Sequence, residues 1–154
     1  MQYSILFFLT LNNSFYFWLM NLIIDKGNTK IKLYIFKHSE IQFFKSISET
    51  FLKDVLNEIS SQFKIQKIIV STVGKDFNFN INNIFPKVEN VIHLNSTLKV
   101  PFKNTYKTPN TLGADRIALI SSAFMKYPNE NTLVIDAGSC ITFDFINKEN
   151  DYLG

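Results

Sequence analysis

One local pattern constrains the fold of this chain more than any other: a short apolar strand that ends in an acid, a glycine and small polar residues. Residues 22–24 form the apolar run, and Asp25, Gly27 and residues 28–29 follow it. Residues 31–36 are again mostly apolar, which predicts a second strand paired with the first through a tight turn. Asp, Asn and Gly are common turn residues, so a plain hairpin connection and a ligand-binding loop are both open.

The same pattern occurs a second time, in residues 133–144. Aligning Asp25 with Asp136 also superposes Gly27 on Gly138 and the preceding apolar positions on one another. Such a recurrence predicts two related half-domains that face a shared cleft. It also favours nucleotide binding by the loops over a pair of plain hairpin turns.

The residues of both loops suit a phosphate group. Gly27 and Gly138 let the backbone approach a ligand closely and direct N–H groups at it. Neutral side-chain donors stand beside those amides, namely Asn28, Thr29 and Ser139. Carboxylates repel phosphate, so Asp25 and Asp136 suggest a cation held between carboxylate and phosphate by hard oxygen ligands.

Composition favours a packed domain and argues against several classes of function. Apolar residues make up 46% of the 154 residues, with 16 Phe among the aromatic ones, and predict a buried core. Sixteen basic against thirteen acidic residues, evenly spread, do not argue for nucleic-acid binding. The single cysteine, Cys140, fits a reducing compartment and is interpreted as a small core residue on the strand after the second loop. Neither His38 nor His93 has a Cys or an acidic residue at metal-ligand spacing in the sequence, which argues against a zinc site.

Hydrophobic periodicity predicts an α/β fold, a mixed sheet with helices packed on it. Further strands are expected over residues 40–44, 68–70 and 91–94. Helices are expected over residues 48–63, over 76–85 and, beginning between 108 and 111, up to 127. Ser48 is the predicted N-cap of the first of these helices.

The domain organisation follows from breaks in these patterns. Residues 101–109 contain two prolines and mark the predicted boundary between a first domain, 20–108, and a second domain, 109–154. The second domain would end one strand into its sheet, so we expect it to be incomplete. Residues 1–19 lack the basic start of a signal peptide and the uninterrupted apolar length of a membrane span. We interpret them as an extension outside the fold, with Met20 as the natural start.

The helix expected after residue 108 carries Gly113, Asp115 and Arg116 in its first turns. A glycine inside a helix costs up to about 1 kcal/mol relative to Ala, so it suggests a ligand close to the backbone. Adjacent helical side chains diverge by about 100°. The Asp115 carboxylate could therefore lie beside a reacting hydroxyl while the Arg116 guanidinium fixes an anion. An acid near a helix N-terminus is also favoured by the helix dipole alone, and that alternative stays open.

Three ordered blocks within residues 21–154 resemble the type III pantothenate kinases, which phosphorylate pantothenate with ATP in the first step of coenzyme A synthesis. The segment from Asp25 to Lys32 is similar to the family's first phosphate loop, Asp-x-Gly-Asn-Thr-x-x-Lys. The segment 106–116, which contains Tyr106 and ends in Gly-Ala-Asp-Arg, resembles its pantothenate-binding segment. The run Asp-Ala-Gly-Ser that begins at Asp136 resembles its second phosphate loop.

The resemblance implies an actin and sugar-kinase-like fold, related to ribonuclease H, in which two similar domains clasp ATP. It implies Asp115 as the general base and Asp136 as the ligand of a monovalent cation, K⁺ or NH₄⁺. The implied ATP contacts are Asp25, Lys26, Gly27, Asn28, Thr29, Lys30, Ile31, Lys32 and Ser139, the last of which replaces a family Thr. The implied pantothenate contacts are Tyr106, Gly113, Ala114, Asp115 and Arg116.

The resemblance further implies Mg²⁺ bound with ATP, a cytoplasmic location, a homodimer in the complete protein, and no nucleic-acid or membrane partner. Family members continue well beyond the segment that matches the end of this chain, so we expect a fragment that is inactive alone. Two alternatives remain open. One is a non-catalytic nucleotide-binding or transcription-accessory module of the same fold, and the other is a sugar-kinase-fold phosphotransferase with another acceptor.

Overall fold

The computed structural model describes residues 20–72, 79–137 and 140–154 of the chain. It divides into two compact units, one that ends at Leu94 and one that begins at Asn95. The predicted boundary lies later in the sequence, within residues 101–109, and the assignment of two functional domains stays a prediction. The predicted N-terminal extension lies outside the described residues.

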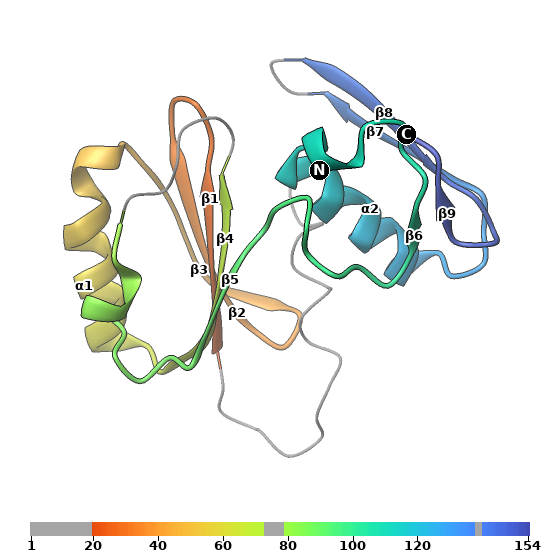
Figure 1. Cartoon of the computed structure of the whole chain (residues 1–154). Helices are drawn as coiled ribbons and strands as arrows, with labels where there is room; N and C mark the ends of the chain where they lie inside the picture. Colours follow the sequence, from red (N-terminus) through yellow and green to blue (C-terminus); the bar gives the residue numbers. More distant parts are fainter. Residues whose placement is uncertain (1–19, 73–78, 138–139) are drawn as a thin grey trace. The chain divides into compact units, whose positions relative to one another are not determined.

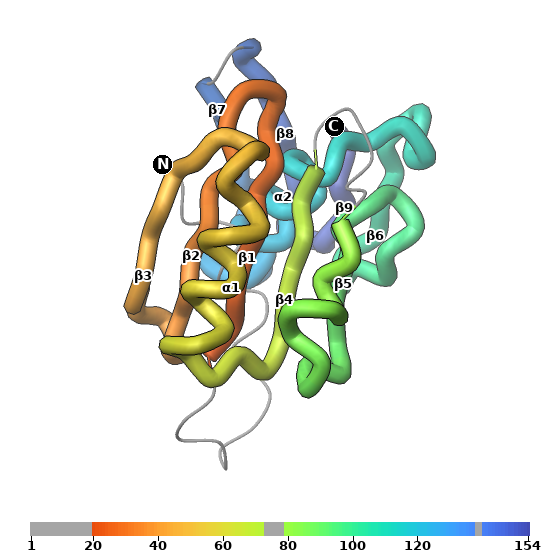
Figure 2. The backbone as a smooth tube through the Cα atoms, turned by 90° about the vertical axis from the view of Figure 1, so that its left-hand side faces the viewer, coloured from red at the N-terminus to blue at the C-terminus, as the bar shows by residue number. Residues whose placement is uncertain are grey.

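The unit that ends at Leu94 is built on a five-stranded mixed sheet, whose strands are labelled in Figure 1. Their order, β3-β2-β1-β4-β5, can be followed in Figure 2. Its strands are β1 (Met20–Lys26), β2 (Ile31–Lys37), β3 (Glu40–Ile47), β4 (Ile65–Thr72) and β5 (Asn90–His93). The antiparallel pairs are β1–β2 and β2–β3, and β4 runs parallel to both β1 and β5. The predicted hairpin and the parallel strand around residues 68–70 are therefore confirmed.

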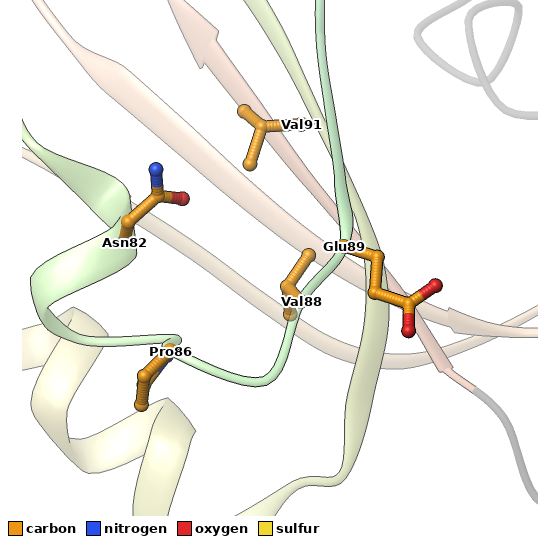
Figure 3. A pocket seen from close by; sticks show the side chains of 5 residues that line it. All are labelled: Asn82, Pro86, Val88, Glu89 and Val91. Carbon is orange, nitrogen blue, oxygen red and sulfur yellow. The ribbon is translucent and has the colours of Figure 1, made fainter.

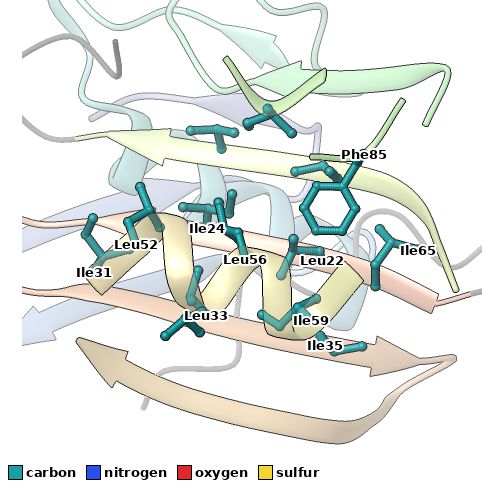
Figure 4. Packing of buried hydrophobic residues seen from close by; sticks show 14 of the residues in the cluster. Leu22, Ile24, Ile31, Leu33, Ile35, Leu52, Leu56, Ile59, Ile65 and Phe85 are labelled. Carbon is teal, nitrogen blue, oxygen red and sulfur yellow. The ribbon is translucent and has the colours of Figure 1, made fainter. Parts of the chain in front are cut away.

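Helix α1 (Leu52–Gln62) covers one face of this sheet, as Figure 2 shows for the part over β1 and β2. Its apolar face carries Leu52, Leu56 and Ile59, which are at most 3% exposed. These side chains pack on residues of β1 and β2 in one buried cluster (Figure 4). The helix predicted from periodicity is confirmed, because apolar residues recur on the side that meets the sheet.

The predicted N-cap of this helix is wrong. The chain enters α1 through a short 3-10 helix, η2 (Glu49–Phe51), and the N-cap of α1 is Phe51. Within the described residues the Ser48 side chain makes no capping hydrogen bond, and its Oγ instead lies 2.9 Å from Oγ1 of Thr50. The extra turn places Ser48 too far upstream to reach the first free amides of α1.

The helix predicted over residues 76–85 is also wrong over residues 79–85, the part that the structure describes. Residues 76–78 lie outside the described residues. Only a single 3-10 turn, η3 (Ile81–Asn83), is formed over residues 79–85. The Asn80 side chain accepts a hydrogen bond from the Asn82 amide at 3.1 Å. Asparagine side chains compete in this way with the helical backbone bonds, which explains why the apolar pattern did not produce a helix.

The unit that begins at Asn95 has a four-stranded sheet with the order β6-β9-β8-β7 and one helix. Its strands are β6 (Lys103–Asn104), β7 (Thr132–Ala137), β8 (Ile141–Ile146) and β9 (Asp151–Tyr152). Helix α2 (Ala114–Lys126) follows the 3-10 turn η4 (Pro109–Thr111), so it starts later than the sequence predicted.

The two faces of the β7–β8 hairpin differ in their surroundings. Helix α2 packs on one face and shares a core with Ile146 and Tyr152. The opposite face carries large exposed apolar side chains, namely Leu133, Ile135, Ile141 and Phe143.

In the described part of the chain, no helix is long and apolar enough to cross a membrane.

The duplicated pattern of the sequence appears as two antiparallel hairpins, β1–β2 and β7–β8. Asp25 and Asp136 each occupy the last position but one of the first strand, opposite Lys32 and Thr142 respectively. The two acids therefore hold the same place in two equivalent elements, as the sequence predicted.

Candidate functional site

The first loop is a tight turn between β1 and β2. The Gly27 amide donates a hydrogen bond to the Lys30 carbonyl at 3.0 Å, which closes the turn. Asn28, Thr29 and Lys30 are exposed around it. Gly27 lacks the left-handed φ that favours glycine, and a Cβ there would lie 3.5 Å from the Lys30 oxygen, an ordinary contact. Backbone geometry therefore does not require a glycine at this position.

Two other residues of the first loop segment face the core of their unit. Lys26 is buried, and its Nζ lies 2.6 Å from Oε1 of Glu49 in η2. Ile31 is 2% exposed within the cluster under α1. Asp25 points to the opposite face of β1 from Lys26, because successive strand residues alternate. The loop thus presents its acid on one face and is fastened to η2 through the other.

In the second loop the structure describes Asp136 but neither Gly138 nor Ser139, which lie outside the described residues. Asp136 is half-buried on the face of β7 that carries Val134, which packs into the core with α2. Its cross-strand neighbour is Thr142, whose Oγ1 is buried without a hydrogen-bond partner in the described part of the chain. Cys140 was predicted to be a core residue and is instead exposed ahead of β8, so that prediction is wrong.

Gly113 is the N-cap of α2 and not an interior residue, which corrects the prediction. A Cβ at Gly113 would collide with Oδ1 of Asp115. That oxygen turns back and accepts a hydrogen bond from the Arg116 amide at 2.8 Å. The structure thus supplies a local reason for the glycine: it leaves room for the Asp115 carboxylate at the start of the helix.

The Arg116 guanidinium points away from that carboxylate, toward β8 and Tyr106. Its Nε and Nη2 lie 2.8 Å and 2.6 Å from Oδ1 of Asp144. Its Nη1 donates to the Tyr106 hydroxyl at 3.2 Å, and its carbon lies 4.9 Å from the centre of the Tyr106 ring. The hydrogen bond that the guanidinium donates to Asp144 is the main reason that the pKa of Arg116 is raised above its usual value. The predicted divergence of Asp115 and Arg116 is observed.

Sequence reasoning missed Asp144 and Tyr152. Both are 0% exposed, and the Tyr152 hydroxyl donates to the same Oδ1 that binds Arg116. Burial, with help from Asp144, raises the pKa of Tyr152, which keeps the hydroxyl protonated as a donor. One signal was available: Asp144 interrupts an apolar strand between Phe143 and Phe145, and a buried acid needs partners.

Metal-ligating groups are sparse in the described part of the chain, where no cluster of three or more His, Cys, Asp or Glu side chains could hold an ion. The Asp136 carboxylate and the Thr142 hydroxyl are hard oxygen donors on neighbouring strands. Oxygen donors of this kind fit a hard cation better than a soft transition metal, which prefers nitrogen or sulfur ligands.

A separate surface hollow of about 580 Å³ lies in the unit that ends at Leu94 (Figure 3). Its lining consists of Asn82, Pro86, Val88, Glu89 and Val91. One carboxylate, one amide and three apolar side chains provide neither a nucleophile with a base nor a cationic group for phosphate. None of the candidate residues that the structure describes lines the hollow.

Comparison with known proteins finds a matching family model, several relatives and a similar solved structure. A family model described as type III pantothenate kinase matches residues 21–154. A type III pantothenate kinase of Christiangramia forsetii is 39% identical over 138 residues, which cover 88% of this chain and 56% of that protein. The type III pantothenate kinase of Flavobacterium psychrophilum is 36% identical over 142 residues, with the same coverage. A crystal structure of a conserved Baf family protein from Campylobacter jejuni has a TM-score of 0.48 at 27% identity and covers 86% of this chain and 51% of that one. The chain spans about half the length of the curated relatives it matches.

Proposed function

The chain belongs to the type III pantothenate kinase family, and on that premise we propose that it forms part of an enzyme that transfers the γ-phosphate of ATP to the hydroxyl of pantothenate. One observation carries the choice of site. At the start of α2, Arg116 turns to Tyr106 while the Asp115 carboxylate turns back toward Gly113. The proposed base, Asp115, and the guanidinium of Arg116, which would hold the substrate together with Tyr106, therefore point in different directions from adjacent residues.

The two hairpin loops are the proposed ATP contacts. The turn at residues 27–30, which is exposed at residues 28–30, offers backbone amides and the side-chain donors of Asn28 and Thr29 to phosphate oxygens. Mg²⁺ bound with ATP would offset the charge between those oxygens and the carboxylates. Asp136, with the hydroxyl of Thr142, would hold a monovalent cation. We extend the proposal to a cytoplasmic homodimer without nucleic-acid or membrane partners.

Asp115 is the proposed general base. The pantothenate hydroxyl oxygen forms a bond to the γ-phosphorus, the bond from that phosphorus to the leaving ADP oxygen breaks, and the hydroxyl proton passes to the Asp115 carboxylate. Little covalent help is needed in phosphoryl transfer, so the main task of the protein is alignment and charge compensation. One oxygen of Asp115 is held by the Arg116 amide at 2.8 Å, which fixes the orientation of the carboxylate.

The proposal is tested with a fusion enzyme, in which this chain is joined to the part of the Christiangramia forsetii relative that it does not cover. We expect ADP release that depends on pantothenate, measured in a coupled assay. ATP binding without turnover would favour the non-catalytic module instead. Turnover with another alcohol but not with pantothenate would favour a phosphotransferase of different specificity.

Substitution Gly27→Ala tests whether the first loop binds phosphate. Because the backbone tolerates a Cβ there, the free energy of unfolding should stay unchanged or rise by up to about 1 kcal/mol. The affinity for ATP should fall about tenfold or more, since the added methyl group blocks close approach of a phosphate. Binding of a fluorescent ATP analogue and urea unfolding measure the two effects. Unchanged ATP affinity would support the plain hairpin turn.

Substitution Gly113→Ala tests the placement of the Asp115 carboxylate. The new Cβ forces that carboxylate to rotate, and kcat of the fusion enzyme should fall about 10- to 100-fold. The control is the same change in an Asp115→Asn background, where little further loss is expected if the effect acts through residue 115. Equal losses in both backgrounds would show that the glycine serves some other purpose.

A further inference from the structure

Arg116 is the only arginine of the chain, in which the other fifteen basic residues are lysines. Arginine differs from lysine in its planar fork of donors, which can hold two partners in a fixed geometry. The structure shows such a use, because Nε and Nη2 bind Asp144 while Nη1 binds the Tyr106 hydroxyl. A lysine could not make these contacts together. The arginine at position 116 is therefore explained by its two partners, Asp144 and Tyr106.

Asp144 is the centre of these contacts. It is fully buried, and its Oδ1 receives hydrogen bonds from Arg116 and from the Tyr152 hydroxyl. Its Oδ2 is buried without a partner in the described part of the chain. A buried carboxylate is costly unless paired, so the Arg116 cation and the Asp144 anion hold each other in place.

Tyr106 is fixed by the same part of the fold. The backbone of β9 holds the segment before it, since the Thr105 amide and hydroxyl donate to the Tyr152 carbonyl at 2.9 Å and 2.6 Å. The Tyr106 ring stacks on the Tyr152 ring with the ring centres 6.0 Å apart. Gly154 lies so close to the Tyr106 ring that a Cβ there would come within 2.6 Å of the ring. One buried pair, Asp144 and Tyr152, thus holds both Tyr106 and Arg116, which come from different segments of the chain.

We propose that Asp144 is a positioning residue for the acceptor site: it fixes the Arg116 guanidinium against Tyr106 and so sets the surface that receives pantothenate. This inference rests on the proposed function. It assigns to Asp144 no contact with substrate and no proton transfer. Its effect on pantothenate is indirect, through the orientation of Arg116.

The first test concerns the chain as it is. With a single arginine, the ¹⁵N-labelled 154-residue chain gives one arginine side-chain Nε–H signal in NMR. Hydrogen exchange at that group should be slow in the unsubstituted chain and about tenfold or more faster in Asp144→Asn. The matched control is Asp151→Asn, which removes an acid paired with the exposed Lys103 in the same unit and should leave the exchange unchanged. Equally fast exchange in all three chains would overturn the proposal.

The second test separates positioning from simple loss of structure. In the fusion enzyme, Asp144→Asn should raise KM for pantothenate about tenfold or more and leave KM for ATP unchanged. Should this variant fail to fold, Tyr152→Phe removes one donor to Asp144 and should give the same pattern at smaller size. Unchanged KM for pantothenate with faster exchange would overturn the positioning role and leave the proposed function intact. Failure of the proposed function appears differently, as an unsubstituted fusion enzyme that does not phosphorylate pantothenate.

Discussion

Replacing Asp115 with asparagine in the fusion enzyme should lower kcat by about 10²- to 10⁴-fold, the usual contribution of a positioned general base. Asparagine keeps the shape of the side chain and an oxygen that can accept the Arg116 amide hydrogen bond seen at 2.8 Å. What it loses is the capacity to take the hydroxyl proton as the phosphorus–oxygen bond forms. Affinity for ATP should therefore remain unchanged, which equilibrium binding would measure beside the coupled kinase assay.

A matched control separates this role from the helix dipole. Asp54 occupies the first turn of α1 as Asp115 occupies the first turn of α2. An acid at such a place stabilises a helix by about 0.3–1 kcal/mol through the dipole alone. Asp54→Asn should therefore cost a little stability and no activity. If Asp115→Asn behaved in the same way, the carboxylate would be a helix-terminus residue only and the proposed base would have to be sought elsewhere.

The parts of the fold that were predictable are those set by local periodicity. The β1–β2 hairpin follows from the two apolar runs on either side of Asp25 and Gly27, and α1 follows from apolar residues at helical spacing. Helix starts were harder, because the 3-10 turns η2 and η4 delay α1 and α2 beyond the first suitable polar residue. The asparagine-rich segment after residue 78 gave no helix where it is described, since Asn80 binds a neighbouring amide instead.

Only the part of the candidate site that lies within one short segment of the sequence could be predicted. Tyr106, Asp115 and Arg116 stand in one short segment and could be singled out together. The contact of Arg116 with Asp144 and that of Tyr106 with Tyr152 could not be predicted, because Asp144 and Tyr152 belong to β8 and β9, far along the sequence from that segment. The sequence also gave no reason for Gly113 beyond ligand access, whereas the structure shows that the Asp115 carboxylate fills the space where a Cβ would lie.

The first loop is carried by strands that pack on α1. Substitution Leu56→Ala in that core should lower the free energy of unfolding by about 2–5 kcal/mol. Leu56 is 0% exposed and lies at the centre of the cluster between α1 and the strands that carry the loop (Figure 4). Truncation removes apolar contacts and leaves a cavity that a close-packed core cannot fill. Urea unfolding of the chain would measure the loss, and hydrogen exchange should show the largest rise in β1, β2 and β4.

Lys53→Ala provides the control, since Lys53 is exposed on the same helix and should change the free energy of unfolding by no more than about 0.5 kcal/mol. A loss of similar size in both variants would mean that the helix as a whole, and not the buried face, determines stability. The comparison also bears on function, because Lys26 fastens the loop to η2 directly before α1. If α1 holds that strand end in place, ATP affinity should fall in Leu56→Ala in proportion to the faster exchange in β1, and Lys53→Ala should leave both unchanged.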